Sequence, residues 1–183
     1  MRRTIAIRPA LPTDYDFLRL VLVEAAFWRQ DGPRPPVDEA LARPGLARYL
    51  DGWGRPGDSG VVAEADATPV GAAWYRLFDS AEPGYGFVAP EIPELTVAVL
   101  REWRGRGAGT ALLQALIERC RIEGRPALSL SVEWGNPARR LYERLGFLRC
   151  GEAGGSWTMR LDLATPPATR RGGSARGGRG GAR

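Results

Sequence analysis

The chain contains no histidine and no lysine, so all 26 of its basic residues are arginines. Without histidine, a Ser-His or Cys-His nucleophilic pair is excluded, and so is a metal site built on imidazole. Without lysine, the chain cannot carry the Gly-Lys-Ser/Thr end of a Walker loop. The sequence therefore excludes several common kinds of hydrolase, metalloenzyme and nucleotide-binding site.

Cysteines and long apolar runs are also scarce. Cys120 and Cys150 are the only cysteines, too few for a disulfide framework and without metal-ligand spacing, and we expect both to be buried thiols. No apolar run approaches the ~20 residues that a membrane-spanning helix needs, and residues 4–8 are too short for a signal-peptide core. We therefore expect a cytoplasmic protein that binds neither a membrane nor a metal.

The net charge of +5 comes from the last twenty residues, because residues 164–183 hold five arginines and no acid. This Arg/Gly-rich segment has no large apolar residue, so we expect a disordered tail after one domain of residues 1–163. Such tails contact nucleic acid, but this one lacks an aromatic residue for stacking, and at most weak contacts are expected. The domain itself is formally neutral.

The densest motif lies in residues 94–113. Residues 95–99 alternate like a strand, and apolar residues from Leu112 to Ile117 recur at helical spacing. The junction between them carries three alternate glycines and two arginines: Arg104, Gly105, Arg106, Gly107 and Gly109. Unshielded N–H groups at the positive end of a helix can hold a phosphate or pyrophosphate. The spacing differs from the dinucleotide fingerprint, and a tight turn without a ligand is the alternative.

A second motif follows. Residues 127–133 alternate like a strand, and Asn136 and Pro137 are typical of a helix start, with Gly146 at its end. Together the two motifs resemble the GNAT superfamily of N-acyltransferases. The matching residues are Arg104, Gly107 and Gly109 in the first motif and Asn136, Ala138, Leu141, Tyr142, Gly146 and Phe147 in the second. The resemblance extends over residues 4–163, with Arg101 where many members carry proline.

The resemblance and the order of the remaining elements imply the same fold. Strands are expected at 5–10, 61–65, 70–78, 94–99, 127–133, 147–152 and 156–163, and helices at 13–29, 38–42, 107–123 and 137–145. We therefore expect an α/β fold with a GNAT-like mixed, mostly antiparallel sheet of about seven strands. Helices should cover both faces, and the sheet should be splayed between its fourth and fifth strands.

The resemblance also implies an acetyl-CoA-dependent N-acetyltransferase. It places the pyrophosphate on the glycine turn and the pantetheine arm along the fourth strand, with Asn136 near a cofactor amide. The implied acetyl-CoA-binding residues are Val97, Ala98, Val99, Arg104, Gly105, Arg106, Gly107, Ala108, Gly109, Thr110 and Asn136. A backbone N–H of Val99 or Leu100 is expected to polarise the thioester.

For catalysis, the resemblance assigns protonation of the leaving thiolate to Tyr142, whose ring could otherwise only pack on the sheet. Glu94 occupies the place of a base that works through water in many relatives, and Glu133 is its rival. Either glutamate could instead be a solvated carboxylate at a strand end. Phe27 and Trp28 are expected near the acceptor, together with the loop 79–93.

The acceptor is expected to be an amine of a small molecule or of a peptide, and a homodimer stays open. A high local density of rings favours a small amine, although Trp74 is more simply explained as a core residue. Two other readings remain: a catalytically silent acyl-CoA-binding domain whose tail contacts nucleic acid, and a nucleic-acid-binding protein in which the fold is incidental.

Overall fold

The computed structural model describes residues 4–29, 34–43 and 45–163. The strands are β1 (Ile5–Pro9), β2 (Ser59–Ala65), β3 (Thr68–Arg76), β4 (Glu94–Val99), β5 (Ala127–Glu133), β6 (Leu148–Ala153) and β7 (Ser156–Asp162). The helices are α1 (Tyr15–Ala26), α2 (Val37–Leu41), α3 (Ala108–Ile122) and α4 (Arg139–Arg144), with short 3-10 turns at Pro12–Asp14, Ala47–Tyr49 and Arg101–Trp103. The expected tail lies outside the described residues.

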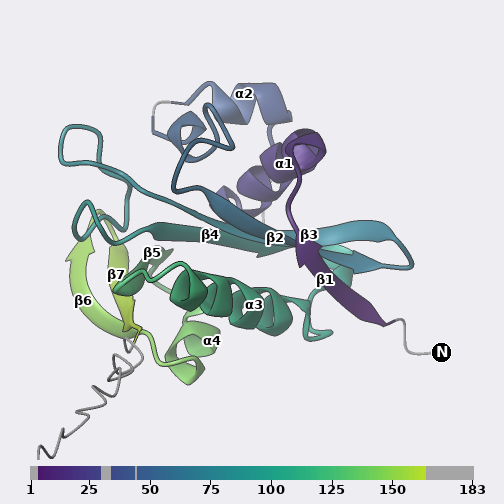
Figure 1. Cartoon of the computed structure of the whole chain (residues 1–183). Helices are drawn as coiled ribbons and strands as arrows, with labels where there is room; N and C mark the ends of the chain where they lie inside the picture. Colours follow the sequence, from purple (N-terminus) through teal and green to yellow (C-terminus); the bar gives the residue numbers. More distant parts are fainter. Residues whose placement is uncertain (1–3, 30–33, 44, 164–183) are drawn as a thin grey trace, which may run out of the picture.

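The seven strands form one sheet in the order β1-β2-β3-β4-β5-β7-β6. All neighbouring pairs are antiparallel except β4 and β5, which are parallel. Helices α1 and α2 lie on one face of the sheet, and α3 and α4 lie on the other (Figure 1). The expected mixed, mostly antiparallel sheet with helices on both faces is confirmed.

Each face of the sheet has its own core because successive side chains of a strand point to opposite faces. In β2, Val61 and Ala63 pack under α3, whereas Val62 packs under α1. In β3, Tyr75 belongs to the α3 core and Trp74 to the α1 core. Trp74 is fully buried, which confirms it as a core residue.

The sheet is splayed at its centre. Strands β4 and β5 share a single registered pair, Glu94 with Ser129, next to a hydrogen bond from the Ser129 N–H to the Pro93 carbonyl at 2.9 Å. Beyond this point the two parallel strands separate, while β4 stays paired with β3 as far as Val99. The expected splay between the fourth and fifth strands is therefore present, and it opens toward the carboxyl ends of both strands.

A buried ion pair holds the segment that follows α2 against the sheet. Arg76 is fully buried and donates to both carboxylate oxygens of Asp58, at 2.9 and 2.6 Å. Its other nitrogen donates to the carbonyls of Arg48 and Asp51, at 2.7 and 2.8 Å. A buried guanidinium is tolerated when its donors are satisfied in this way. The result is a fixed position for the turn that carries Tyr49.

Several boundaries differ from expectation. Helix α1 begins at Tyr15 rather than Thr13, because Pro12–Asp14 form a 3-10 turn, in which the Asp14 carboxylate accepts the Leu11 N–H and binds Arg8. Helix α4 begins at Arg139, after an Asn136 turn. Cys120 is buried as expected, but Cys150 is exposed because β6 is an edge strand with few residues packed against it.

In the described ranges, no helix combines the length and the apolar character that a membrane crossing requires. No group of three or more acidic or cysteine side chains could hold a metal ion there either.

Candidate active site

The glycine turn leads from β4 into α3, and its backbone has an unusual conformation. Gly105 and Gly107 have φ angles of 73° and 90°, in the left-handed region that other residues avoid. Gly107 is the N-cap residue of the 15-residue helix α3. A Cβ at either glycine would meet no atom within 4 Å, so the turn faces open space. Its N–H groups and the helix dipole fit a bound pyrophosphate.

Gly109 differs from its two neighbours. Its φ angle is not in the left-handed region, and a Cβ there would make ordinary contacts with Leu141 and Val99, at 3.6 and 3.8 Å. Neither backbone strain nor crowding therefore requires glycine at this position. A side chain would, however, lie between Val99 at the end of β4 and Leu141 of α4, two residues that line the cleft. A smooth surface for a ligand is the remaining reason for glycine here.

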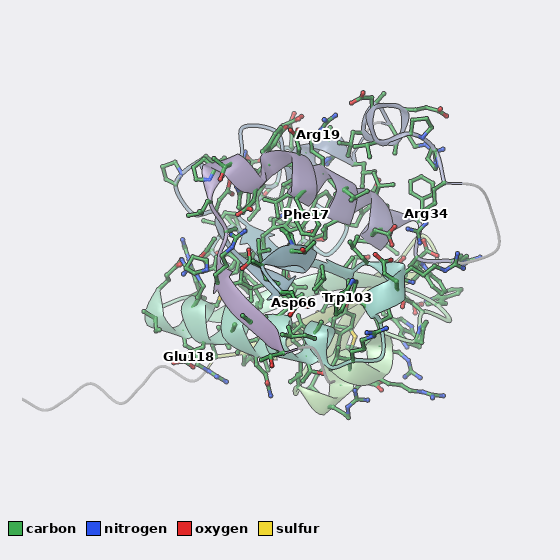
Figure 2. The ribbon with its side chains drawn as sticks, turned by 90° about the vertical axis from the view of Figure 1, so that its right-hand side faces the viewer. Phe17, Arg19, Arg34, Asp66, Trp103 and Glu118 are labelled. Atoms are coloured by element: carbon green, nitrogen blue, oxygen red, sulfur yellow. The ribbon has the colours of Figure 1, made fainter. Side chains whose placement is uncertain are left out.

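The two arginines of the turn have different surroundings. The Arg104 guanidinium donates to the Val99 carbonyl and to Glu24 Oε2, both at 3.0 Å, and burial lowers its pKa. Glu24 is a buried residue of α1 and also pairs with Arg34, which lies beside the end of α1 in Figure 2. Arg106 is exposed and stacks over the Trp103 ring, with its Cζ 4.9 Å from the ring centre. Arg106 is therefore the more accessible charge.

The exit of β4 supplies the edge expected to run along a pantetheine arm. Val97, Ala98 and Val99 pair with β3 on one side and have no ladder partner in β5 on the other. The Leu100 N–H donates to the Val70 carbonyl at 2.9 Å and is not available to polarise a thioester. Of the two N–H groups expected for that role, only the one of Val99 remains a candidate.

The second motif lies across the splay from the glycine turn. Asn136 Oδ1 accepts the Ala138 N–H at 2.9 Å, so the side chain shapes the approach to α4. Tyr142 of α4 is buried, with its ring edge-to-face against Phe147 at 5.9 Å between centres. Burial raises the Tyr142 pKa to about 12, so the phenol stays protonated at neutral pH. Its hydroxyl lines the same cleft as Val99 and Gly109 without a hydrogen bond to a described residue.

Glu94 lies at the start of β4, on the floor of that cleft. Its side chain is 3% exposed. One carboxylate oxygen, Oε1, accepts the Tyr49 hydroxyl at 2.7 Å and the Gly86 N–H at 2.8 Å. Burial raises its pKa from 4.5 to about 7, against the opposing effects of these two hydrogen bonds and of Arg48. A carboxylate that changes protonation near neutral pH is suited to accept a proton.

Glu133, the rival base, has different surroundings. It lies at the end of β5, 45% exposed at its side chain, and forms an ion pair with Arg29 at 3.1 Å. This pair joins the residues after α1 to the end of β5 across the rim of the cleft. Ser131 and Ser129 precede Glu133 on the same face of β5, opposite the apolar residues that pack under α3. Glu133 is therefore a rim residue, whereas Glu94 is buried.

The residues expected near the acceptor do line this cleft. Phe27 and Trp28 follow α1, and the Trp28 indole Nε1 is buried without a hydrogen-bond partner in the part of the chain that the structure describes. Arg43 lies over the Phe27 ring, with its Cζ 4.8 Å from the ring centre. No carboxylate in the described ranges pairs with Arg43. An aromatic wall results, and among the described residues neither the Arg43 guanidinium nor the Trp28 indole N–H has a hydrogen-bond partner.

Three residues of the site gave no sequence signal. Tyr49 and Arg43 lie outside the strands and helices expected from the sequence, and Glu24 lies within the expected helix 13–29 with no sign of a role. Each contacts a partner distant in the chain: Tyr49 contacts Glu94, Glu24 contacts Arg104, and Arg43 contacts Phe27. Only the fold brings these partners together, and an alternating or helical pattern does not register such contacts.

Comparisons with known proteins agree with this geometry. The Acetyltransferase (GNAT) family model matches residues 19–147. The L-methionine sulfoximine/L-methionine sulfone acetyltransferase of Pseudomonas paraeruginosa is 45% identical over 128 residues, which are 69% of this chain and 67% of that protein.

Two solved structures extend the likeness over the fold. The ribosomal-protein-alanine N-acetyltransferase of Brucella melitensis superposes with a TM-score of 0.63 at 28% identity, over 86% of this chain and 99% of that one. The protein yncA of Salmonella typhimurium, solved with its cofactor acetyl-CoA, superposes with a TM-score of 0.65 at 23% identity, over 90% of this chain and 96% of that one.

Proposed function

The chain belongs to the acetyltransferase (GNAT) family and is an acetyl-CoA-dependent N-acetyltransferase, and from this premise we propose that its acceptor is the α-amino group of a small amino acid. In this proposal Glu94 is the base and Tyr142 is the acid. The observation that carries the assignment of the base is the burial of Glu94 on the floor of the cleft, between two donors to one of its oxygens.

The reaction needs two proton transfers that side chains of this chain can perform. When bound, acetyl-CoA supplies a thioester, whose C–S bond breaks as the new amide C–N bond forms. Glu94 takes a proton from the attacking amine, directly or through water, because its raised pKa keeps it a usable base near pH 7. Tyr142 donates its phenolic proton to the leaving sulfur, because burial keeps that phenol protonated. The Arg29 ion pair at the rim makes Glu133 a weaker candidate for the base.

We propose that acetyl-CoA binds to the glycine turn, the edge of β4 and the segment before α4. The N–H groups from Gly105 to Thr110 receive the pyrophosphate, with Arg106 as the accessible charge and Ala108 inside the first turn of α3. The edge of β4 from Val97 to Val99 lies along the pantetheine arm, and Asn136 faces it from the start of α4. The open space at the turn and the missing ladder partner in β5 support this placement.

Two groups that have no hydrogen-bond partner among the described residues support an amino acid as the acceptor. The Arg43 guanidinium, held over Phe27, has the charge and geometry to bind an α-carboxylate. The buried Trp28 Nε1 can donate to an oxygen on the acceptor side chain. The relative from Pseudomonas paraeruginosa is named for two amino acids of that description, methionine sulfoximine and methionine sulfone. Both groups line the cleft that contains Glu94.

An acceptor panel tests this proposal, with release of free CoA thiol as the measurement. Methionine sulfone should react at a rate that saturates, and its amide, which keeps the amine but lacks the carboxylate, should show a KM raised about tenfold. Activity restricted to peptides would overturn the small-acceptor proposal. Tight acetyl-CoA binding with no turnover on any amine would favour a catalytically silent domain.

We propose further that the enzyme acts in the cytoplasm, where a CoA thioester is available. We also propose that residues 1–163 form the catalytic domain and that the Arg/Gly-rich segment 164–183 takes no part in acetyl transfer. Truncation after residue 163 should leave kcat and both KM values unchanged. Sedimentation tests directly whether the enzyme is a homodimer.

A further inference from the structure

Tyr49 makes two hydrogen bonds through its single hydroxyl group. The hydroxyl oxygen accepts the Tyr85 N–H at 2.7 Å, and the hydroxyl also lies 2.7 Å from Glu94 Oε1. A backbone N–H can only donate, so the one phenolic proton is left to point at Glu94. Burial and the nearby carboxylate raise the Tyr49 pKa far above its ordinary value. The phenol therefore remains a donor to Glu94 across the pH range in which Glu94 titrates.

The same carboxylate oxygen has a second donor. Gly86 N–H lies 2.8 Å from Oε1, so the two lone pairs of that oxygen are both occupied. The other oxygen, Oε2, is buried and has no hydrogen-bond partner in the described part of the chain. A proton that arrives at Glu94 must therefore add to Oε2, since protonation of Oε1 would break one of two short hydrogen bonds.

Glycines and aromatic rings hold this arrangement in place. A Cβ at Gly84 would overlap Glu94 Oε2, and a Cβ at Gly86 would overlap the backbone of Leu130 and Ser131. The loop can approach both the carboxylate and β5 only because these two residues lack side chains. The Tyr49 ring is stacked on Tyr85 with 6.0 Å between centres and meets Phe78 edge-to-face at 5.1 Å. The hydroxyl thus has little freedom to turn away.

We propose that Tyr49 is a positioning residue for the acetyl transfer: together with the Gly86 N–H it saturates Glu94 Oε1, so that the proton of the attacking amine is accepted at Oε2. The inference rests on the proposed role of Glu94 as the base. Tyr49 touches neither substrate in this role, and it acts only through the carboxylate. Because its hydrogen bond stabilises the ionised form, it also keeps Glu94 a base at a lower pH than burial alone would allow.

The test is the pH dependence of kcat/KM for the acceptor in Tyr49→Phe. The variant keeps the ring and both ring contacts, and the Trp74 indole bonds to the Tyr49 backbone carbonyl, which is unchanged. We expect the acid limb to move up by about one pH unit, with activity approaching wild type again above the new limb. KM for acetyl-CoA should not change. A uniform loss of activity with an unmoved acid limb would overturn the inference.

Tyr75→Phe is the matched control. It removes the hydroxyl of another fully buried tyrosine, on the opposite face of the sheet in the α3 core. Its acid limb should coincide with that of wild type. If the acid limb of the pH profile shifts equally in both variants, loss of any buried hydroxyl group moves it, which would also overturn the inference.

A second measurement uses the wild-type protein and needs no variant. The phenolic proton of Tyr49 should be visible by proton NMR as a slowly exchanging, downfield resonance near Glu94. It should persist on both sides of the Glu94 titration, because Oε1 accepts it in both protonation states. Disappearance of this resonance as Glu94 becomes protonated would place the transferred proton on Oε1 and refute the assignment to Oε2.

Failure of the inference and failure of the proposed function give different results. If Glu94→Gln retains full activity, Glu94 is not the base, and the proposed mechanism fails whatever Tyr49→Phe does. If Glu94→Gln is inactive while the acid limb of Tyr49→Phe is unmoved, the base stands and the role of Tyr49 is wrong.

Discussion

The substitution Glu94→Gln should have two separate effects: one on catalysis, through loss of the base, and one on the free energy of unfolding, through loss of a buried titratable group. A glutamine fits the site, because its Oε1 can accept from Tyr49 and Gly86 as the carboxylate does. Its amide nitrogen then takes the place of Oε2, beside Gly84. The change therefore removes the titration of residue 94 and keeps the hydrogen bonds to Oε1.

The size of the stability effect follows from the pKa of Glu94. Burial raises it from 4.5 to about 7 in the folded protein, so the unfolded chain loses this proton first as the pH rises. Between these two values the folded state binds more protons, and the stability of the wild type falls with increasing pH. At 1.36 kcal/mol per unit, the loss attributable to Glu94 amounts to about 3 kcal/mol across the window.

The assay is urea unfolding of both proteins at intervals from about pH 4.5 to about pH 8. The free energy of unfolding of Glu94→Gln minus that of wild type should rise by about 3 kcal/mol across this range and level off above it. In the same variant, kcat/KM at neutral pH should fall about a hundredfold or more.

Comparing the variant with wild type at each pH cancels the constant cost of burying the amide. Glu118→Gln is a suitable control, since Glu118 lies on the exposed side of α3 (Figure 2), with a side chain that is 61% exposed. Among the described residues it pairs only with Arg121, at 3.5 Å. The difference in unfolding free energy between Glu118→Gln and wild type should be nearly independent of pH. If the difference in unfolding free energy between Glu94→Gln and wild type is also independent of pH, the folded protein does not raise the pKa of Glu94, and the reasoning is refuted.

The other predictions concern acid catalysis and both substrates. Tyr142→Phe should lower kcat about a hundredfold with KM for acetyl-CoA unchanged, as measured by thiol release; a normal kcat would remove Tyr142 from the mechanism. Gly107→Ala should cost about 1–2 kcal/mol in urea unfolding, because its φ of 90° is strained for alanine. Gly109→Ala should leave stability unchanged and still weaken acetyl-CoA binding by calorimetry, and unimpaired binding would contradict a ligand at this glycine. Arg43→Gln should raise KM for methionine sulfone about tenfold but not for its amide, and an equal rise for both would exclude a carboxylate contact.

The part of the fold that we propose holds the cofactor could be predicted because its signals are local. The alternation of residues 95–99, the glycines at 105 and 107 and the helical apolar spacing after Thr110 each depend on neighbours a few positions away. The structure places β4 and α3 as these patterns indicate, and it shows left-handed glycines in the turn between them. Short-range steric and periodic rules were therefore sufficient for this region.

Other features depend on contacts that no local pattern encodes. Tyr49 and Glu94 are 45 residues apart in sequence, and Glu24 and Arg104 are 80 apart. The exposure of Cys150 depends on β6 being an edge strand, and an alternating pattern does not tell an edge strand from a central one. These features follow only once the strand order and the packing of α1 are known.

The contact of Arg104 with Glu24 also changes what the glycine motif means in this chain. A buried carboxylate such as Glu24 needs partners, and Arg104 and Arg34 supply them. Because Arg104 also binds the Val99 carbonyl, its guanidinium joins α1, which leads to the acceptor wall, to the exit of β4, which leads to the glycine turn. The hydrogen-bond donors of Arg104 are thus already engaged by Glu24 and Val99 before an anion arrives. We therefore expect the pyrophosphate to be held mainly by the N–H groups of the turn and by the exposed Arg106, and Arg104 to act as the brace between the two substrate sides.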